Sequence, residues 1–178
     1  MLITPLELVL IPAVEVLIGL GGPYLRIRTS SDYWLYASLF STTCPVAMDE
    51  NEVVGVVIAF RSQDNPDDVY LQDVMTHPDH RRRGIARSLI ATIHRQAAVW
   101  ECKRLYLTSE PDNTTAHGSW LALGFANTRG DQTIEGISVI SNYKGSDQAS
   151  RGLRTDCQSH PVGRHARPAR RHPVRGSR

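Results

Sequence analysis

The stretch VYLQDVMTHPDHRRRGIARSLI, residues 69–90, decides the fold. Its first eight residues are typical of a strand, and the His77-Pro78 pair ends that strand. Arg81-Arg82-Arg83-Gly84 then forms a basic turn. A predicted amphipathic helix follows, with apolar residues at four-residue steps, namely Ile85, Leu89, Ile93 and Ala97. A strand, a basic glycine turn and a helix therefore follow one another directly.

The segments on either side of this stretch predict further strands and helices. Apolar runs at 42–48 and 53–60 indicate a β-hairpin, and 104–108, 125–129 and 132–140 indicate more strands. A strand and a helix are expected in residues 1–20, with short helices at 24–40 and 114–123. A chain of 178 residues is the size of one domain. We therefore expect a single α/β (α+β) domain with a mixed, mostly antiparallel sheet of about six to seven strands flanked by helices.

The charge is divided unevenly along the chain. Residues 1–143 carry a formal charge of −5, whereas residues 144–178 carry +7 and lack apolar periodicity. We expect a folded domain over 1–143 and a basic, disordered tail over 144–178. No aromatic residues interleave with the arginines of the last part of the tail, so nucleic-acid binding is disfavoured.

Cysteine usage and the apolar beginning of the chain exclude several classes of protein. Cys44, Cys102 and Cys157 are far apart, which excludes a disulfide framework and a zinc ribbon and predicts a cytoplasmic protein without metal. Prolines and glutamates interrupt residues 1–20, and no Lys or Arg precedes Arg26. We therefore expect neither a signal peptide nor a membrane span.

The basic turn before the predicted helix is suited to an anion. The first N–H groups of a helix are unpaired and carry a partial positive charge, and four nearby arginines add to it. Neither a Walker motif nor a G-x-G-x-x-G motif is present. Taken alone, the pattern fits either a phosphate-bearing ligand or a solvated basic turn.

Two motifs together resemble a known family. Arg81-x-x-Gly84-x-Ala86 resembles the [QR]-x-x-G-x-[GA] signature of the GNAT N-acetyltransferases, and NTTAHGSWLALGF, residues 113–125, resembles their later N-x-x-A-x-x-x-[YFW]-x-x-x-G-F block. The resemblance implies acetyl-CoA as co-substrate, with no metal. It assigns the pantetheine arm to the backbone at Val74, Met75 and Thr76. It assigns the rest of the cofactor to Arg81, Arg82, Arg83, Gly84, Ile85, Ala86, Arg87, Asn113 and Trp120.

The chemistry implied by the family requires a proton acceptor, because an alkyl ammonium with a pKa of about 10.4 is almost fully protonated at pH 7. Asp73 is the candidate, since Leu71-Gln72-Asp73-Val74 resembles the L-E-D-[LF] stretch of polyamine and small-amine acetyltransferases. Gln72 replaces one carboxylate of that stretch. A structural hydrogen bond or salt bridge is the alternative role of Asp73. The backbone N–H of Met75 or of its neighbour would stabilise the oxyanion.

Trp120 stands where many relatives carry a tyrosine that protonates the leaving thiolate. Because an indole N–H is not appreciably acidic, water or His117 would supply that proton, unless His117 is only a solvent-facing helix residue. Trp120 is expected to pack near the cofactor.

The acceptor is expected to be a small amine. Residues 31–55 loosely resemble acetyltransferases of diaminobutyrate and of aminoglycosides. The candidate substrate residues are Asp32, Tyr33, Trp34, Tyr36 and Gln72, although a hydrophobic core helix also explains the aromatic ones. We expect acetyl transfer to a primary amine of a diamine, polyamine, diamino acid or aminoglycoside. A protein or peptide amine, or a coenzyme A-binding module without turnover, remains the alternative, and a homodimer stays open.

Overall fold

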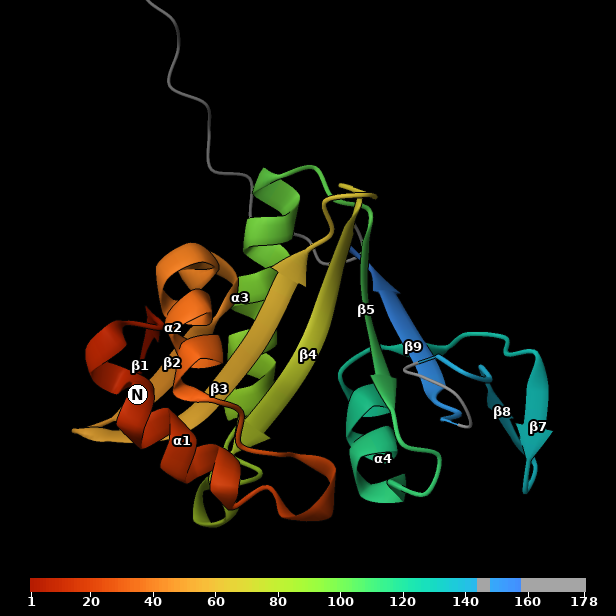
Figure 1. The fold of residues 1–178 in the computed structure, drawn as a ribbon, viewed down its shortest axis with the longest axis horizontal. Helices are drawn as coiled ribbons and strands as arrows, with labels where there is room; N and C mark the ends of the chain where they lie inside the picture. Colours follow the sequence, from red (N-terminus) through yellow and green to blue (C-terminus); the bar gives the residue numbers. More distant parts are fainter. Residues whose placement is uncertain (144–147, 158–178) are drawn as a thin grey trace, which may run out of the picture.

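The computed structural model describes residues 1–143 and 148–157, which form one sheet with helices on both faces (Figure 1). The sheet has seven strands in the order β1-β2-β3-β4-β5-β9-β6, and all neighbours are antiparallel except β4 and β5. The expected architecture is thereby confirmed. The strands are β1 Leu2–Pro5, β2 Pro45–Asp49, β3 Glu52–Arg61, β4 Asp68–Thr76, β5 Arg104–Ser109, β6 Ala126–Asn127 and β9 Arg151–Asp156. A separate hairpin consists of β7 Gln132–Ile134 and β8 Ile137–Val139.

The helices form two layers around the sheet. One layer contains α1 (Ile11–Gly19) and α2 (Ser30–Leu39), and α3 (Ile85–Val99) lies behind β3 and β4 (Figure 1). Helix α4 (Thr114–Ala122) follows β5. Short 3-10 turns are found at Leu8–Leu10, Gly22–Tyr24, Ser41–Thr43 and Pro78–His80. Among the described residues, no helix is long and apolar enough to cross a membrane.

Each face of the sheet has its own apolar core. On the α3 face, the predicted stripe of Ile85, Leu89, Ile93 and Ala97 is buried together with apolar residues of β3, β4, β5 and β9. On the other face, Val14 and Leu17 of α1 and Tyr33 of α2 are buried. Gly55 permits the close approach of β3 to α3, because a Cβ there would lie 2.6 Å from Ile85 Cγ2.

A β-bulge changes which face the side chains of β4 occupy. Ile58 pairs with Asp73 but Ala59 pairs with Leu71, so Gln72 is the extra residue. Leu71 and Val74 therefore both pack on the α3 side, whereas Met75 packs on the α1 side. The sequence alternation predicts that Leu71, Asp73 and Met75 share one face. That prediction is wrong for Leu71, which packs on the face opposite to Met75, because simple period-two alternation does not hold across a bulge.

The parallel pairing of β4 with β5 is short. Only residues from Asp68 to Leu71 pair with β5, opposite Arg104 to Leu107. Beyond the bulge the two strands diverge, and α4 lies near the end of β5 where they are far apart (Figure 1). The edge of β4 from Gln72 to Thr76 that faces away from β3 thus has no strand partner within the described part of the chain.

The expected domain boundary at residue 143 is wrong. Strand β9, which lies beyond that boundary, is inserted between β5 and β6 and pairs with both. Leu153 is fully buried, and Arg151 is buried with its guanidinium donating to the Pro111 carbonyl at 3.1 Å. Basic and glycine-rich composition concealed the strand. The rest of the expected tail, residues 144–147 and 158–178, lies outside the described residues.

Candidate active site

The basic turn after β4 presents unpaired backbone donors. Gly84 precedes α3 in the left-handed conformation, with φ of +79°, and no side chain caps the helix. Arg82 is also left-handed, with φ of +62°. The side chains of Arg81, Arg82 and Arg83 are exposed. The N-terminus of α3 therefore combines free N–H groups, the positive end of the helix dipole and a local excess of cations, which suits a phosphate group.

The unpaired edge of β4 carries its own backbone groups. The His77 N–H donates to the Val54 carbonyl at 2.9 Å. Because every second residue of an antiparallel strand directs its backbone N–H toward the same neighbour, the N–H of Met75 also points toward β3. The N–H groups of Val74 and Thr76 consequently point away from β3, toward the side where β5 has diverged. Of the expected oxyanion donors, this alternation favours Val74 over Met75. The Met75 side chain is part of the core on the α1 face.

Three expected cofactor residues have structural partners. Asn113 is the N-cap of α4, and its side-chain oxygen accepts from Ala116 N–H at 3.1 Å. The Arg87 guanidinium donates to the Ala122 carbonyl at 3.1 Å and so ties the start of α3 to the end of α4. Trp120 packs on Phe125, with ring centroids 5.5 Å apart, and against the core on the α3 face. Each of these side chains helps to fix α4 beside the diverging strands.

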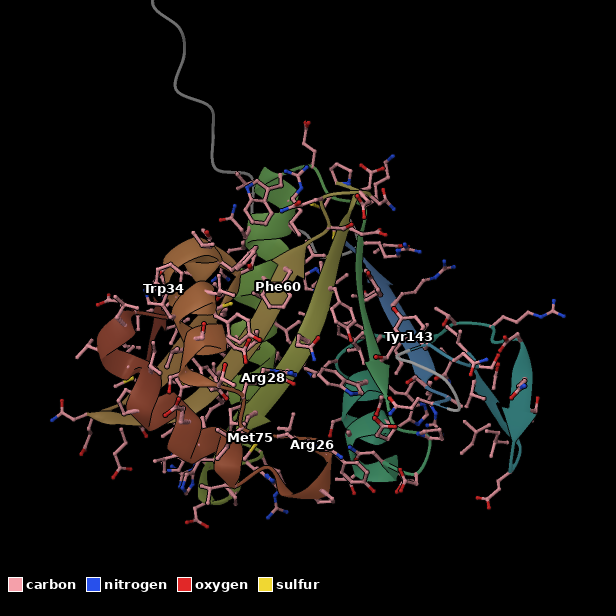
Figure 2. All side chains as sticks on the ribbon, viewed as in Figure 1. Arg26, Arg28, Trp34, Phe60, Met75 and Tyr143 are labelled. Carbon is pink, nitrogen blue, oxygen red and sulfur yellow. The ribbon has the colours of Figure 1, made fainter. Side chains whose placement is uncertain are left out.

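An ion pair lies on the α1 face of β4. The Arg28 guanidinium donates to Asp73 Oδ2 from Nε and from Nη2, each at 3.2 Å, and Nη2 also lies 3.4 Å from Oδ1. The Asp73 side chain is 10% exposed and that of Arg28 is 32% exposed. Burial lowers the pKa of Arg28, but Asp73 together with Tyr36 and Tyr33 outweighs burial, and the net shift is upward. In Figure 2, Arg28 lies in front of β4 and Arg26 lies nearer to α4.

Two aromatic residues of α2 surround this ion pair. Tyr33 is 1% exposed, and its hydroxyl accepts from the Arg28 backbone N–H at 3.5 Å. Tyr36 stacks edge-on against Tyr33 and also contacts Phe60. Burial raises the pKa of Tyr36 to about 12. The tyrosines therefore form a neutral, partly apolar wall beside Arg28 and Asp73.

The other two candidate substrate residues of this segment do not join that wall. Asp32 forms a capping box with Thr29, and this lowers the pKa of its carboxyl. Trp34 is 51% exposed and lies on the far side of α2 from β4 (Figure 2). The structure therefore brings Tyr33 and Tyr36 to the site, but uses Asp32 as a helix cap and leaves Trp34 on the surface.

His117 has a partner on β6. Its Nε2 lies 2.9 Å from Asn127 Oδ1. In the sheet, β5 and β9 separate β6 from β4. This hydrogen bond therefore directs the half-buried imidazole toward β6 rather than toward Asp73.

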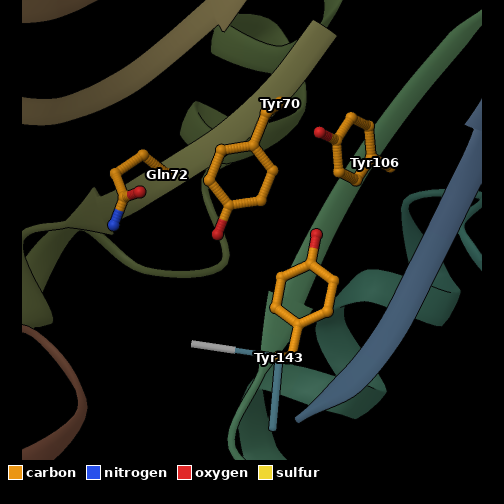
Figure 3. A pocket seen from close by; sticks show the side chains of 4 residues that line it. All are labelled: Tyr70, Gln72, Tyr106 and Tyr143. Atoms are coloured by element: carbon orange, nitrogen blue, oxygen red, sulfur yellow. The ribbon is translucent and has the colours of Figure 1, made fainter. Parts of the chain in front are cut away.

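A shallow pocket of about 340 Å³ adjoins the bulge. Gln72 and Tyr70 line it from β4, Tyr106 lines it from β5, and Tyr143 completes it (Figure 3). Tyr70 and Tyr106 are register partners with ring centroids 5.1 Å apart. Gln72, the neighbour of Asp73 in the chain, is thus part of the lining of a tyrosine pocket.

The segment between α1 and α2 extends toward the turn between β5 and α4 (Figure 1). Burial and the carboxylates of Asp112 and Glu110 raise the pKa of Tyr24, which places Tyr24 close to that turn. This segment therefore lies near the end of the sheet where β4 and β5 diverge (Figure 1).

Sequence reasoning missed Arg28 and the tyrosine pocket. A signal for Arg28 was present, because it is one of two arginines in an otherwise neutral segment before an aromatic helix. The tyrosines gave a weaker signal, since their meeting depends on the parallel register of β4 and β5.

Comparisons with known proteins agree with this geometry. Residues 18–125 match the Acetyltransferase (GNAT) family, and the chain belongs to that family. A curated relative is the L-2,4-diaminobutyric acid acetyltransferase of Chromohalobacter salexigens, 32% identical over 97 residues, which are 54% of this chain and 50% of the relative. An aminoglycoside N(6')-acetyltransferase type 1 of Salmonella typhimurium is 33% identical over 60 residues, 34% of this chain and 41% of that protein. The chain spans about half the length of the first of these curated relatives.

Solved structures share the fold. The diaminobutyrate acetyltransferase of Paenibacillus lautus, solved with L-2,4-diaminobutyric acid and coenzyme A, has a TM-score of 0.68 at 24% identity, covering 85% of this chain and 93% of that one. The ribosomal-protein-S18-alanine N-acetyltransferase of Escherichia coli has a TM-score of 0.67 at 14% identity, and the match covers 93% of this chain and 99% of that one. At these identities the likeness establishes the fold.

Proposed function

We propose that the protein transfers the acetyl group of acetyl-CoA to a primary amine of a small molecule. One observation carries the proposal: the unpaired edge of β4 leads directly into the uncapped N-terminus of α3. An extended thioester arm can pair with the edge of β4 as an added strand does, and a pyrophosphate can bind at the N-terminus of α3. Membership of the GNAT family and the names of the curated relatives support the same activity.

The cofactor would be held mainly by backbone. The N–H groups of residues 82–87 would bind the pyrophosphate, and the exposed arginines 81–83 would attract it. Val74 and Thr76 would pair with the pantetheine arm, and the Val74 N–H would stabilise the oxyanion. Asn113 and Trp120 would act less directly, by fixing α4 beside this arm.

Asp73 would accept the proton that the substrate ammonium must lose. We assign the proton to Oδ1, the oxygen with the longer hydrogen bond to Arg28. The amine nitrogen then forms a bond to the acetyl carbon while the carbon–sulfur bond breaks and the electron pair leaves with sulfur. The acetylated nitrogen then still carries one excess proton. Because Trp120 is not an acid and His117 bonds to Asn127, water would take this proton from nitrogen and deliver it to the thiolate, leaving a neutral amide and the thiol.

A thiol-release assay tests the proposal directly. We expect acetyl-CoA to be consumed with at least one amine from a panel of diamines, diamino acids and aminoglycosides. Asp73→Asn should lower kcat by about 10²–10⁴-fold at neutral pH. Asp67→Asn, which removes an exposed carboxylate paired with Lys103, is the matched control and should leave kcat unchanged. Coenzyme A binding without thiol release for every amine would refute turnover and favour a binding module.

We also propose a reducing, cytoplasmic setting. All three cysteines are buried and free, and burial raises the pKa of Cys44 to about 12. Thiol labelling of protein unfolded without reductant should therefore modify three groups per chain. Fewer than three labelled thiols per chain in protein isolated from cells would contradict this setting.

A further inference from the structure

Arg28 is held on one edge only. Its Nε and Nη2 atoms bond to Asp73, whereas Nη1 makes no hydrogen bond to any residue that the structure describes. A guanidinium has five N–H donors in a rigid planar fork. The ion pair therefore fixes the orientation of the fork, and its outer edge is available to a second anion.

The surroundings of that outer edge suit a carboxylate on the substrate. Tyr33 and Tyr36, on one side of the pair, are neutral. The guanidinium side chain is 32% exposed and lies in front of β4, next to the edge where we propose that the thioester binds (Figure 2). Arg is well matched to planar, bidentate recognition of a carboxylate.

The same arrangement disfavours an acceptor that carries only positive charges. An ammonium that approaches Asp73 must also approach the Arg28 guanidinium, because the two side chains are 3.2 Å apart. Gln72, the other polar residue at the bulge, adds no negative charge. A molecule that carries one ammonium toward Asp73 and one carboxylate toward Arg28 matches both charges.

Building on the proposed acetyl transfer, we propose that Arg28 binds the carboxylate of the acceptor and that the acceptor is an amino acid with a second amine. Asp73 positions Arg28 in addition to its role at the reacting amine. Plain diamines, polyamines and aminoglycosides, which lack a carboxylate, are then poorer substrates. Arg28 is the residue that selects among the small amines.

A matched pair of acceptors tests this inference. L-2,4-Diaminobutyrate and 1,3-diaminopropane differ only by the carboxylate, and 2,4-diaminobutyramide keeps the carbon skeleton without the negative charge. We expect kcat/KM of the wild-type protein to be about 10–100-fold higher for diaminobutyrate than for either analogue without a carboxylate, the range that a hydrogen-bonded ionic partner contributes. Arg28→Met should abolish this ratio, mainly by raising KM for diaminobutyrate. Arg28→Lys, which keeps the charge but not the fork, should retain part of it.

The ratio of kcat/KM for diaminobutyrate to kcat/KM for an analogue without the carboxylate distinguishes a loss of specificity from misfolding, because misfolding lowers both values together. If Arg28→Met does not fold, Arg28→Lys still reports the ratio. A wild-type ratio near one, or a ratio unchanged in both variants, would overturn the role of Arg28 while leaving acetyl transfer in place. Absence of thiol release with every amine of the panel would instead overturn the proposed function itself.

Discussion

Removal of β9 should unfold the domain. A chain ending at residue 143 loses the strand that pairs with β5 from Arg104 to Ser109 and supplies the pairing of β6. It also loses Leu153, which is fully buried. Truncation of one such side chain to alanine costs about 2–5 kcal/mol. Loss of the whole strand additionally exposes the buried Leu105 and Leu107 of β5, so the total should exceed half of an ordinary domain's 5–15 kcal/mol.

The assay is urea and thermal unfolding, followed by circular dichroism, of chains ending at residues 143 and 157. The longer chain keeps every strand of the sheet and should unfold cooperatively, whereas the shorter one should lack a cooperative transition. Full-length Leu153→Ala is the graded control, with a Tm lowered by about 4–20 °C. Equal unfolding midpoints for the two truncated chains would refute the place of β9 in the sheet.

Three smaller perturbations test other parts of the structure. Gly84→Ala forces an alanine into the left-handed conformation before α3, so it should lower the free energy of unfolding by about 1–2 kcal/mol and weaken coenzyme A binding in calorimetry. The control is Gly118→Ala on α4, where a Cβ meets no atom, and it should stabilise the protein by about 0.5–1 kcal/mol. Equal effects of the two substitutions would contradict backbone strain at residue 84. Gly55→Ala crowds Ile85 and should cost about 1–3 kcal/mol in urea unfolding, and a neutral result would mean that β3 and α3 are farther apart. Burial raises the pKa of the Cys44 thiol from 9.0 to about 12, so the stability contributed by the neutral thiol is full below pH 9 and is lost as pH rises toward 12. Cys44→Ala should therefore reduce the decrease of Tm with pH in this range. An unchanged decrease would show that other groups cause it.

The sequence predicted those parts of the fold that depend on local patterns. The four-residue spacing from Ile85 to Ala97 located α3 and its buried face, and a short helix was expected within 24–40, where α2 lies. The bulge at Gln72 was not predictable, because one extra residue in a strand leaves the apolar pattern almost unchanged. Strand β9 was missed because Gly152 and two arginines make it polar, although its register with β5 buries Leu153.

The site was predicted unevenly for a similar reason. The turn at Gly84 was predictable, since its chemistry lies within a few consecutive residues. The role of Asp73 at the reacting amine stays a prediction, and its partner Arg28 was not predictable because it is 45 residues away in the chain and only the fold brings them together. His117 was expected near the reaction and instead bonds to Asn127, because helix phase alone does not show which neighbouring strand a side chain reaches.

The position of β9 has a consequence for synthesis of the chain. Among the described strands, β6 pairs only with β9, yet residues 128–150 separate the two in the sequence. At about 5–20 residues per second, a growing chain exposes β6 and the open edge of β5 for about 1–5 s before β9 emerges to cover them. The early strands β1 to β4 can assemble in that interval. Nascent chains stalled before residue 151 should therefore be the form of this protein that chaperones bind most.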